Sequence, residues 1–287
     1  MTLFIDFRTA GVGGAVGNAK TLEIAPASWP HVSPPLGDTA IAKRVEGKNL
    51  LFATHGFNVH RDEGVRALGR LDSYLRNGGK LSGADVFIGV LWPGDFWIPA
   101  INYPFEGDDA IDCGKRLAAY CARQLKSAQS YSFLSHSLGA RLVLEAVKHL
   151  HIPANSVCLT AAAIDRDCLR REYAKATGNA KSISILASHE DEVLKLAFPI
   201  GNPIYRWFQD AGDHFQLALG YDGPPRPAAP PINAPWQIPD GDKYGHGSYL
   251  PPSSQVPPPP EPDPPQWHQV ADFMANAFNR LPQSWPR

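Results

Sequence analysis

Apolar and amphipathic stretches alternate along most of the chain. Five short, mostly apolar runs are typical of strands buried in a parallel sheet: Asn49–Thr54, Asp85–Trp92, Tyr131–Leu134, Ser156–Ala161 and Lys181–Leu186. Apolar residues at helical spacing follow the first three runs, within 65–75, 108–125 and 140–147. Strands that alternate with helices predict an α/β fold with a mostly parallel central sheet, right-handed crossovers and flanking helices.

The first 47 residues are predicted to form a hairpin and a connection. Leu3–Arg8 and Thr21–Ala25 have the pattern of two short strands, and a glycine-rich link joins them, which favours a hairpin at the sheet edge. The link matches neither a dinucleotide fingerprint nor a phosphate loop, because Val16 and Ala19 stand where glycine is required. Nucleotide binding is therefore not expected.

The alternating pattern stops at residue 223, where prolines become frequent. Residues 223–265 are predicted to be an irregular segment over the surface, since proline favours extended polyproline II and excludes helix and central strand. A docking site for a proline-reading partner is the alternative. A closing helix over 266–281 follows, and its apolar face should pack on the sheet. We expect one domain spanning 1–287.

Composition agrees with a globular enzyme. The chain has 287 residues, 44% of them hydrophobic, and a formal net charge of -1, and no basic stripe indicates nucleic-acid binding. Met1–Arg8 lacks the features of a secretion signal, and no run is long enough to span a bilayer, so we expect a cytoplasmic protein without a transmembrane segment. The four cysteines lack C-x-x-C spacing, which favours buried reduced thiols over a metal site or a disulfide framework.

The pentapeptide Ser135–Gly139 joins an apolar run to an amphipathic one. A serine at a strand-to-helix turn, with glycine two residues later, has the sequence of a nucleophile elbow, which exposes the hydroxyl at a helix N-terminus. Ser135 replaces the first glycine of the usual motif, a small side chain that such a crossing can tolerate. Ser137 is therefore the candidate nucleophile.

A serine nucleophile requires a base and an acid that orients it. We predict Asp191 as the acid, since it follows the strand that ends at Leu186; Asp165, beyond the preceding strand, is the alternative. His246 is the predicted base because it lies in a late loop between two glycines that allow close backbone approach; His214 and His268 are the alternatives.

Two backbone N–H groups should form an oxyanion hole, one after the nucleophile and one after an earlier strand. Leu138 provides the first. Phe57 is predicted to provide the second, because it follows His55 and Gly56 directly after the strand Asn49–Thr54, as in the oxyanion loops of lipases and esterases.

Aromatic residues cluster after the strand Asp85–Trp92. Trp92, Phe96 and Trp97 could cover an apolar substrate pocket, and packing in the core is the equal alternative. If they line a pocket, an acyl or aromatic ester is the substrate that fits them best.

Several of these segments together resemble the α/β-hydrolase superfamily. The chain is most similar to a poorly characterised bacterial branch of lipase-like serine hydrolases, and the resemblance covers roughly residues 48 to 280. It rests on Leu51–Asn58, Trp92–Gly94, Ser135–Leu144, Ser188–Leu194, Ala218–Gly223 and His246. The resemblance implies the triad order Ser, Asp, His, which this sequence reproduces as Ser137, Asp191 and His246.

The expected function is hydrolysis of a small-molecule carboxylic ester through an acyl-enzyme, without a metal or an organic cofactor. A serine peptidase or a thioesterase would use the same triad. A non-catalytic binding module that keeps the fold is the alternative outside the enzymes. The sequence does not specify an oligomeric state.

Overall fold

The computed structural model describes residues 1–10, 14–25, 28–30, 34–94, 103–197, 217–251, 265–283 and 285. In these residues, eight strands form one sheet in the order β2-β1-β4-β3-β5-β6-β7-β8. The strands are β1 (Thr2–Arg8), β2 (Val16–Ile24), β3 (Asn49–Thr54), β4 (Asp85–Leu91), β5 (Ser130–His136), β6 (Ser156–Thr160), β7 (Ile183–Leu186) and β8 (Ile232–Asn233). The pair β1–β2 is antiparallel and the other neighbours are parallel.

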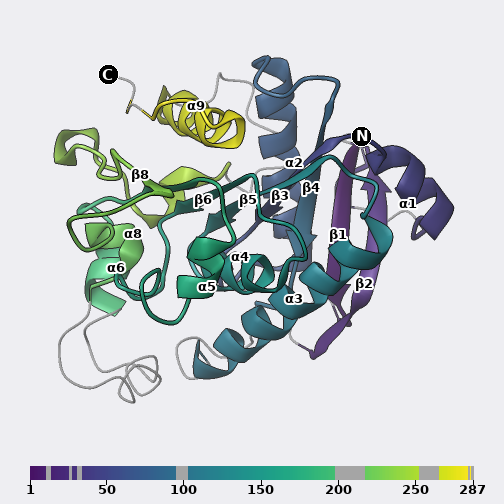
Figure 1. The fold of residues 1–287 in the computed structure, drawn as a ribbon, viewed down its shortest axis with the longest axis horizontal. Coiled ribbons are helices and arrows are strands. Elements are labelled where there is room, and N and C mark those ends of the chain that lie inside the picture. Colours follow the sequence, from purple (N-terminus) through teal and green to yellow (C-terminus); the bar gives the residue numbers. More distant parts are fainter. Residues whose placement is uncertain are drawn as a thin grey trace.

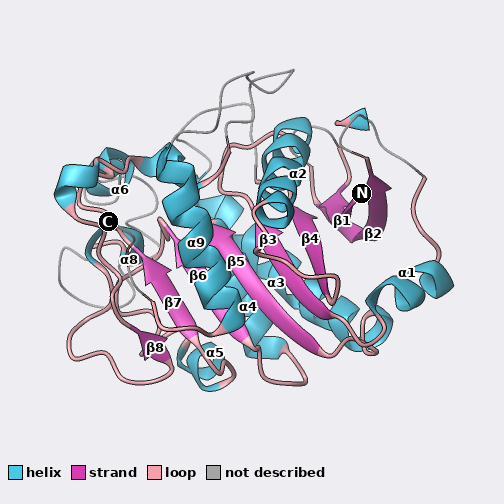
Figure 2. Cartoon of the chain, turned by 90° about the horizontal axis from the view of Figure 1, so that it is seen from above, coloured by secondary structure: helices cyan, strands magenta, loops and turns pink. Residues whose placement is uncertain are grey.

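Helices cover both faces of the sheet. The helices are α1 (Asp38–Val45), α2 (Arg61–Asn77), α3 (Tyr103–Gln124), α4 (Gly139–His149), α5 (Ala174–Gly178), α6 (Glu192–Ala197), α8 (Leu219–Asp222) and α9 (Pro265–Asn279), with 3-10 turns η3 (Asp240–Asp242) and η4 (His246–Tyr249). Figures 1 and 2 show α2 and α9 on one face and α3 and α4 on the other. This is the predicted α/β architecture.

Two hydrophobic cores, one on each face, explain the continuous apolar character of the central strands. Along β3, Leu50 and Phe52 pack into the core shared with α3 and α4. Leu51 and Ala53 pack into the core shared with α2 and α9. Side chains alternate between the two faces of a strand, so a strand covered by helices on both sides must be apolar at every position.

The edge hairpin is present but longer than its pattern predicts. β2 begins at Val16, which pairs with Arg8, rather than at Thr21. Asn18 and Lys20 are exposed in its first half, so hydrogen bonding to β1, and not burial, extends the strand there. The proline-rich region also contains short elements within its irregular course, β8, η3 and η4, in the segments that the structure describes, and α8 directly precedes it.

The carboxyl ends of the parallel strands meet at one edge of the sheet. The registers place Thr54 beside Ser135 and His136 beside Thr160, and Thr160 beside Leu186. The loops that leave β3, β5, β6 and β7 therefore come together there, where ligands bind in sheets of this type.

Candidate active site

Ser137 lies in a strained turn between β5 and α4. Its φ of 55° is in the left-handed region, which costs a non-glycine residue roughly 1–2 kcal/mol. Three backbone hydrogen bonds hold the turn: the Ser137 N–H donates to Thr160 O (3.0 Å), and the Ser137 carbonyl accepts from Ala140 (3.1 Å) and Ala163 (3.2 Å). The end of β6 and the start of α4 thus fix the backbone of the candidate nucleophile.

The loop after β3 lies directly against this turn. A Cβ at Gly56 would stand 2.9 Å from Ser137 Cβ, and a Cβ at Gly139 would stand 2.3 Å from Thr54 Oγ1 and 2.5 Å from His55 O. Glycine is needed at both positions for this close approach. Ser135 is buried, and its Oγ has no hydrogen-bond partner among the described residues.

The two predicted oxyanion donors flank the turn. Leu138 lies at the N-terminus of α4, and its N–H has no hydrogen-bond partner within the described part of the chain. Phe57 follows Gly56, whose closeness to Ser137 brings the loop to the same place. The next residue, Asn58, has a φ of 56° and donates its N–H to Gly94 O, which fixes the turn of this loop.

A continuous chain of hydrogen bonds joins Ser137, His246 and Asp191. His246 Nε2 lies 2.9 Å from Ser137 Oγ, and His246 Nδ1 lies 2.8 Å from Asp191 Oδ2. A carboxylate accepts hydrogen bonds only, so Nδ1 carries the proton and Nε2 is left to accept the proton of Ser137. This arrangement can transfer a proton from the serine hydroxyl.

Asp191 is fully buried and both of its carboxylate oxygens have partners. Oδ2 accepts from His246, and Oδ1 accepts the N–H of Leu194 (3.0 Å) at the start of α6. Nearby, Ser188 Oγ donates to Tyr244 O (2.7 Å) and so connects the segment of the acid with the segment of the base.

Asp165 and His268, two of the alternative residues, make other contacts. Asp165 accepts the N–H of Asp167 through Oδ1 (3.2 Å), and burial raises its pKa to about 6. Within the described residues, the carboxylate bonded to the His246 side chain is that of Asp191. His268 contacts the hydroxyl of Tyr74 on α2, and His214 lies outside the described residues.

The family model described as "Alpha/beta hydrolase of unknown function (DUF900)" matches residues 38–211. The chain belongs to this α/β-hydrolase family. Ser137 and Asp191 of the hydrolase lie within the matched region, whereas His246 lies beyond it. No curated protein matches the sequence.

A solved structure resembles part of the hydrolase. It is "Phospholipase PlaB from Legionella pneumophila in complex with thio-NAD", with 15% sequence identity and a TM-score of 0.35 over 60% of this chain. The hydrolase spans 43% of the length of that structure.

Two further histidines of the hydrolase lie at the site, and neither is suited to be a base. Burial lowers the pKa of both His55 and His136 to about 3; Arg8 adds to the effect at His55, and His246 adds to it at His136. His55 Nδ1 lies 2.8 Å from Gly56 O, and His136 Nε2 lies 2.7 Å from His246 O. No local sequence pattern predicts these contacts.

Trp92 is fully buried, as in the core-packing alternative and not in the alternative that places it at a substrate pocket. Its ring stacks on His55 at 5.7 Å between centroids, and its Nε1–H donates to His55 O (3.0 Å). The side chain therefore packs behind the loop after β3. Phe96 and Trp97, the other residues predicted for the pocket, lie outside the described residues.

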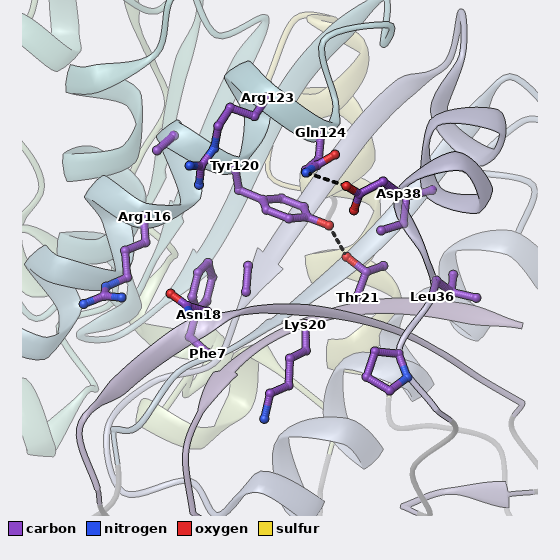
Figure 3. A pocket seen from close by; sticks show the side chains of 14 residues that line it. Phe7, Asn18, Lys20, Thr21, Leu36, Asp38, Arg116, Tyr120, Arg123 and Gln124 are labelled. Atoms are coloured by element: carbon purple, nitrogen blue, oxygen red, sulfur yellow. Dashed lines mark hydrogen bonds between the residues drawn. The ribbon is translucent and has the colours of Figure 1, made fainter.

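A cavity of about 540 Å³ lies away from the triad, between β2 and α3 (Figure 3). The hydroxyls of Tyr120 and Thr21 bond each other at 2.6 Å, and Gln124 donates to Asp38 at 3.1 Å. No residue of the triad lines it. It is therefore separate from the candidate active site.

The described residues of the hydrolase contain neither a membrane-spanning helix nor a cluster of metal-binding side chains. No helix there is long and apolar enough to cross a membrane. No group of three or more His, Cys, Asp or Glu side chains there could hold a metal ion. All four cysteines are buried and unbridged.

Proposed function

We propose that this α/β-hydrolase is a serine hydrolase that cleaves a carboxylic ester of a small molecule through an acyl-enzyme. The observation that carries the proposal is the chain of hydrogen bonds from Ser137 Oγ to His246 Nε2 (2.9 Å) and from His246 Nδ1 to Asp191 Oδ2 (2.8 Å). The left-handed backbone of Ser137 at the end of a central strand supports the same role.

In the first half of the reaction, Ser137 Oγ attacks the ester carbonyl carbon while its proton passes to His246 Nε2. The N–H groups of Leu138 and Phe57 stabilise the oxyanion, and Asp191 stabilises the imidazolium. When the tetrahedral intermediate collapses, the carbon–oxygen bond to the leaving group breaks. The imidazolium gives its proton to the departing oxygen, and an alcohol leaves.

In the second half, His246 takes a proton from water, whose oxygen attacks the acyl carbon. The bond to Ser137 Oγ then breaks, Oγ regains the proton from His246, and a carboxylic acid leaves. No step requires a metal or an organic cofactor.

The position of β5 favours a small ester over a peptide. β3 and β6 pair with β5 on its two sides, so within the described residues the strand that leads to Ser137 has no free edge to which an extended peptide could add. The same triad could cleave thioesters. A panel of matched ester, thioester and amide substrates separates these classes. A series of p-nitrophenyl esters of increasing acyl length measures the size of the acyl site.

The decisive experiment is labelling with a fluorophosphonate probe, with two neighbouring serines compared. We expect Ser137→Ala to abolish labelling and to reduce ester hydrolysis by roughly a millionfold, because the nucleophile is lost. Ser135→Ala is the matched control and should label like the wild type. Persistent labelling of Ser137→Ala would refute the assignment of the nucleophile. A wild-type protein that neither labels nor hydrolyses any ester would instead indicate a non-catalytic binding module.

A further inference from the structure

The backbone around His246 has little steric restraint. His246 lies between Gly245 and Gly247, and a Cβ added at either glycine would meet no atom of the described residues within 4 Å. This differs from the prediction that these glycines serve close backbone approach. Glycines are the residues with the greatest conformational freedom. Packing at these two positions therefore does not fix the segment that carries the candidate base.

The segment of His246 lies between two buried tyrosines and forms the 3-10 turn η4. Tyr244 and Tyr249 are fully buried, and Ser188 Oγ holds the carbonyl of Tyr244. Between them, the Ser248 N–H donates to Gly245 O (3.0 Å). Besides the backbone bonds of η4, the main-chain carbonyl of His246 has one side-chain partner among the described residues, the imidazole of His136.

His136 is well placed to restrain that carbonyl. It is the last residue of β5, it pairs with Thr160 of β6, and it directly precedes Ser137. Its Nε2 lies 2.7 Å from His246 O, and the two rings lie 5.0 Å apart between centroids. A carbonyl only accepts hydrogen bonds, so Nε2 of His136 carries the proton and donates.

We propose that His136 is a positioning residue for the base, and that its Nε2–H fixes the main chain of His246 so that the imidazole of His246 stays between Asp191 and Ser137. This inference rests on the proposed function. It links the strand of the nucleophile with the segment of the base by one hydrogen bond, in addition to the bonds within the triad.

The protonation state of His136 suits this role. Burial, with a contribution from His246, lowers its pKa to about 3, far below the 6.5 of an ordinary histidine. The ring therefore stays neutral and keeps one fixed N–H at the pH values at which an ordinary histidine base works. A neutral ring also avoids repulsion with the imidazolium that forms on His246 during the reaction.

The test compares His136→Gln with His136→Met. The two replacements have similar length and flexibility, but only glutamine has an N–H that can donate to His246 O. Three quantities are measured for each: the fluorophosphonate labelling rate over a range of pH, the separate kcat and KM for an ester, and the downfield proton resonance of the His246 Nδ1–H bonded to Asp191. Melting temperatures show whether each variant is folded.

We expect the methionine variant to lose roughly 100-fold in labelling rate and in kcat, since a displacement of about 1 Å at a reacting group costs that much. KM should stay nearly constant, and the downfield resonance should be lost. The glutamine variant should keep the resonance and most of the rate. Unchanged rate and resonance in the methionine variant would overturn the inference, and so would equal losses in the two folded variants.

The experiment also distinguishes an error in the proposed serine-hydrolase function from an error in the role of His136. If the wild type does not label, the proposed chemistry is wrong, and the resonance alone still tests the positioning. Its loss in the methionine variant and retention in the glutamine variant would support the role of His136. Its presence in both variants, or its absence from the wild type, would overturn that role.

Discussion

The two halves of the candidate site are held in place by different means. Three backbone hydrogen bonds fix Ser137, and close contacts of Gly56 and Gly139 enclose its turn. The segment of His246 forms the turn η4, has no close contacts at Gly245 and Gly247 among the described residues, and is held by side-chain hydrogen bonds to Asp191 and from His136. The comparison teaches that close packing contributes most on the nucleophile side, whereas side-chain hydrogen bonds contribute most on the base side. Substitutions in the two halves should therefore fail differently.

After loss of the nucleophile itself, the largest effect should come from Asp191→Asn, which changes the base side without removing volume. The amide oxygen can keep the bond to the Leu194 N–H, so the NH₂ group then faces His246 Nδ1 and enforces the wrong tautomer. We expect kcat to fall by roughly 10⁴-fold with little loss of stability. Steady-state kinetics and urea unfolding measure the two quantities.

Asp165→Asn is the matched control for this experiment. Asp165 makes no hydrogen bond to His246, so activity should stay close to that of the wild type. If Asp165→Asn reduced activity more than Asp191→Asn, the assignment of the acid would be reversed.

Gly139→Ala should damage the nucleophile side through packing. The added methyl group would meet Thr54 Oγ1 at 2.3 Å and His55 O at 2.5 Å, so the backbone must move. We expect a loss of about 1–3 kcal/mol in the free energy of unfolding, as for other overpacked sites, together with slower labelling of Ser137. Urea unfolding tests the prediction, and an unchanged stability would show that the turn is less tightly enclosed than described.

Lowering the pH should reduce the free energy of unfolding through His55, which lies on the nucleophile side of the site. Its pKa is about 3 in the folded protein and 6.5 when exposed, so the unfolded state binds a proton that the native state excludes. Stability therefore falls as the pH drops from 6.5 towards 3, by about 1.4 kcal/mol per pH unit for this residue. Urea unfolding of His55→Gln should show a shallower pH dependence than the wild type. The exposed His151 offers the control, since His151→Gln should leave the slope unchanged.

The smallest effect is expected for Gly247→Ala on the base side. The new methyl group meets no described residue within 4 Å, so stability should change by less than about 1 kcal/mol, and a gain is expected where the unfolded state loses conformational freedom. Labelling should proceed at nearly the wild-type rate. A large loss of stability would mean that packing also governs this segment, which would remove the contrast with Gly139.

Much of the fold follows from local patterns in the sequence. The central strands lie at the continuous apolar runs, because burial on both faces leaves a strong signal. β2 extends to Val16 beyond its apolar part, since backbone pairing with β1 leaves no such signal. Likewise, no pattern predicts that β1 inserts beside β4.

The contacts that support the candidate site residues are harder to predict from the sequence than the residues themselves. Ser137, Asp191 and His246 follow from chain order and motif, and their roles remain predictions until tested. The contact from His136 to His246 O joins residues 110 positions apart, so no local sequence pattern predicts it. Trp92 shows a related limit, because an aromatic residue after a strand has the same pattern whether it faces a ligand or the core.

The two bonds of Asp191 have an evolutionary consequence. One carboxylate oxygen holds His246 and the other caps the first turn of α6. Under the proposed mechanism, selection for turnover and selection for a folded segment act on the same side chain. A substitution that removed the Asp191 carboxylate would also leave the Leu194 N–H in the first turn of α6 without its acceptor. A descendant that had lost catalysis would therefore still be expected to retain aspartate or asparagine at this position.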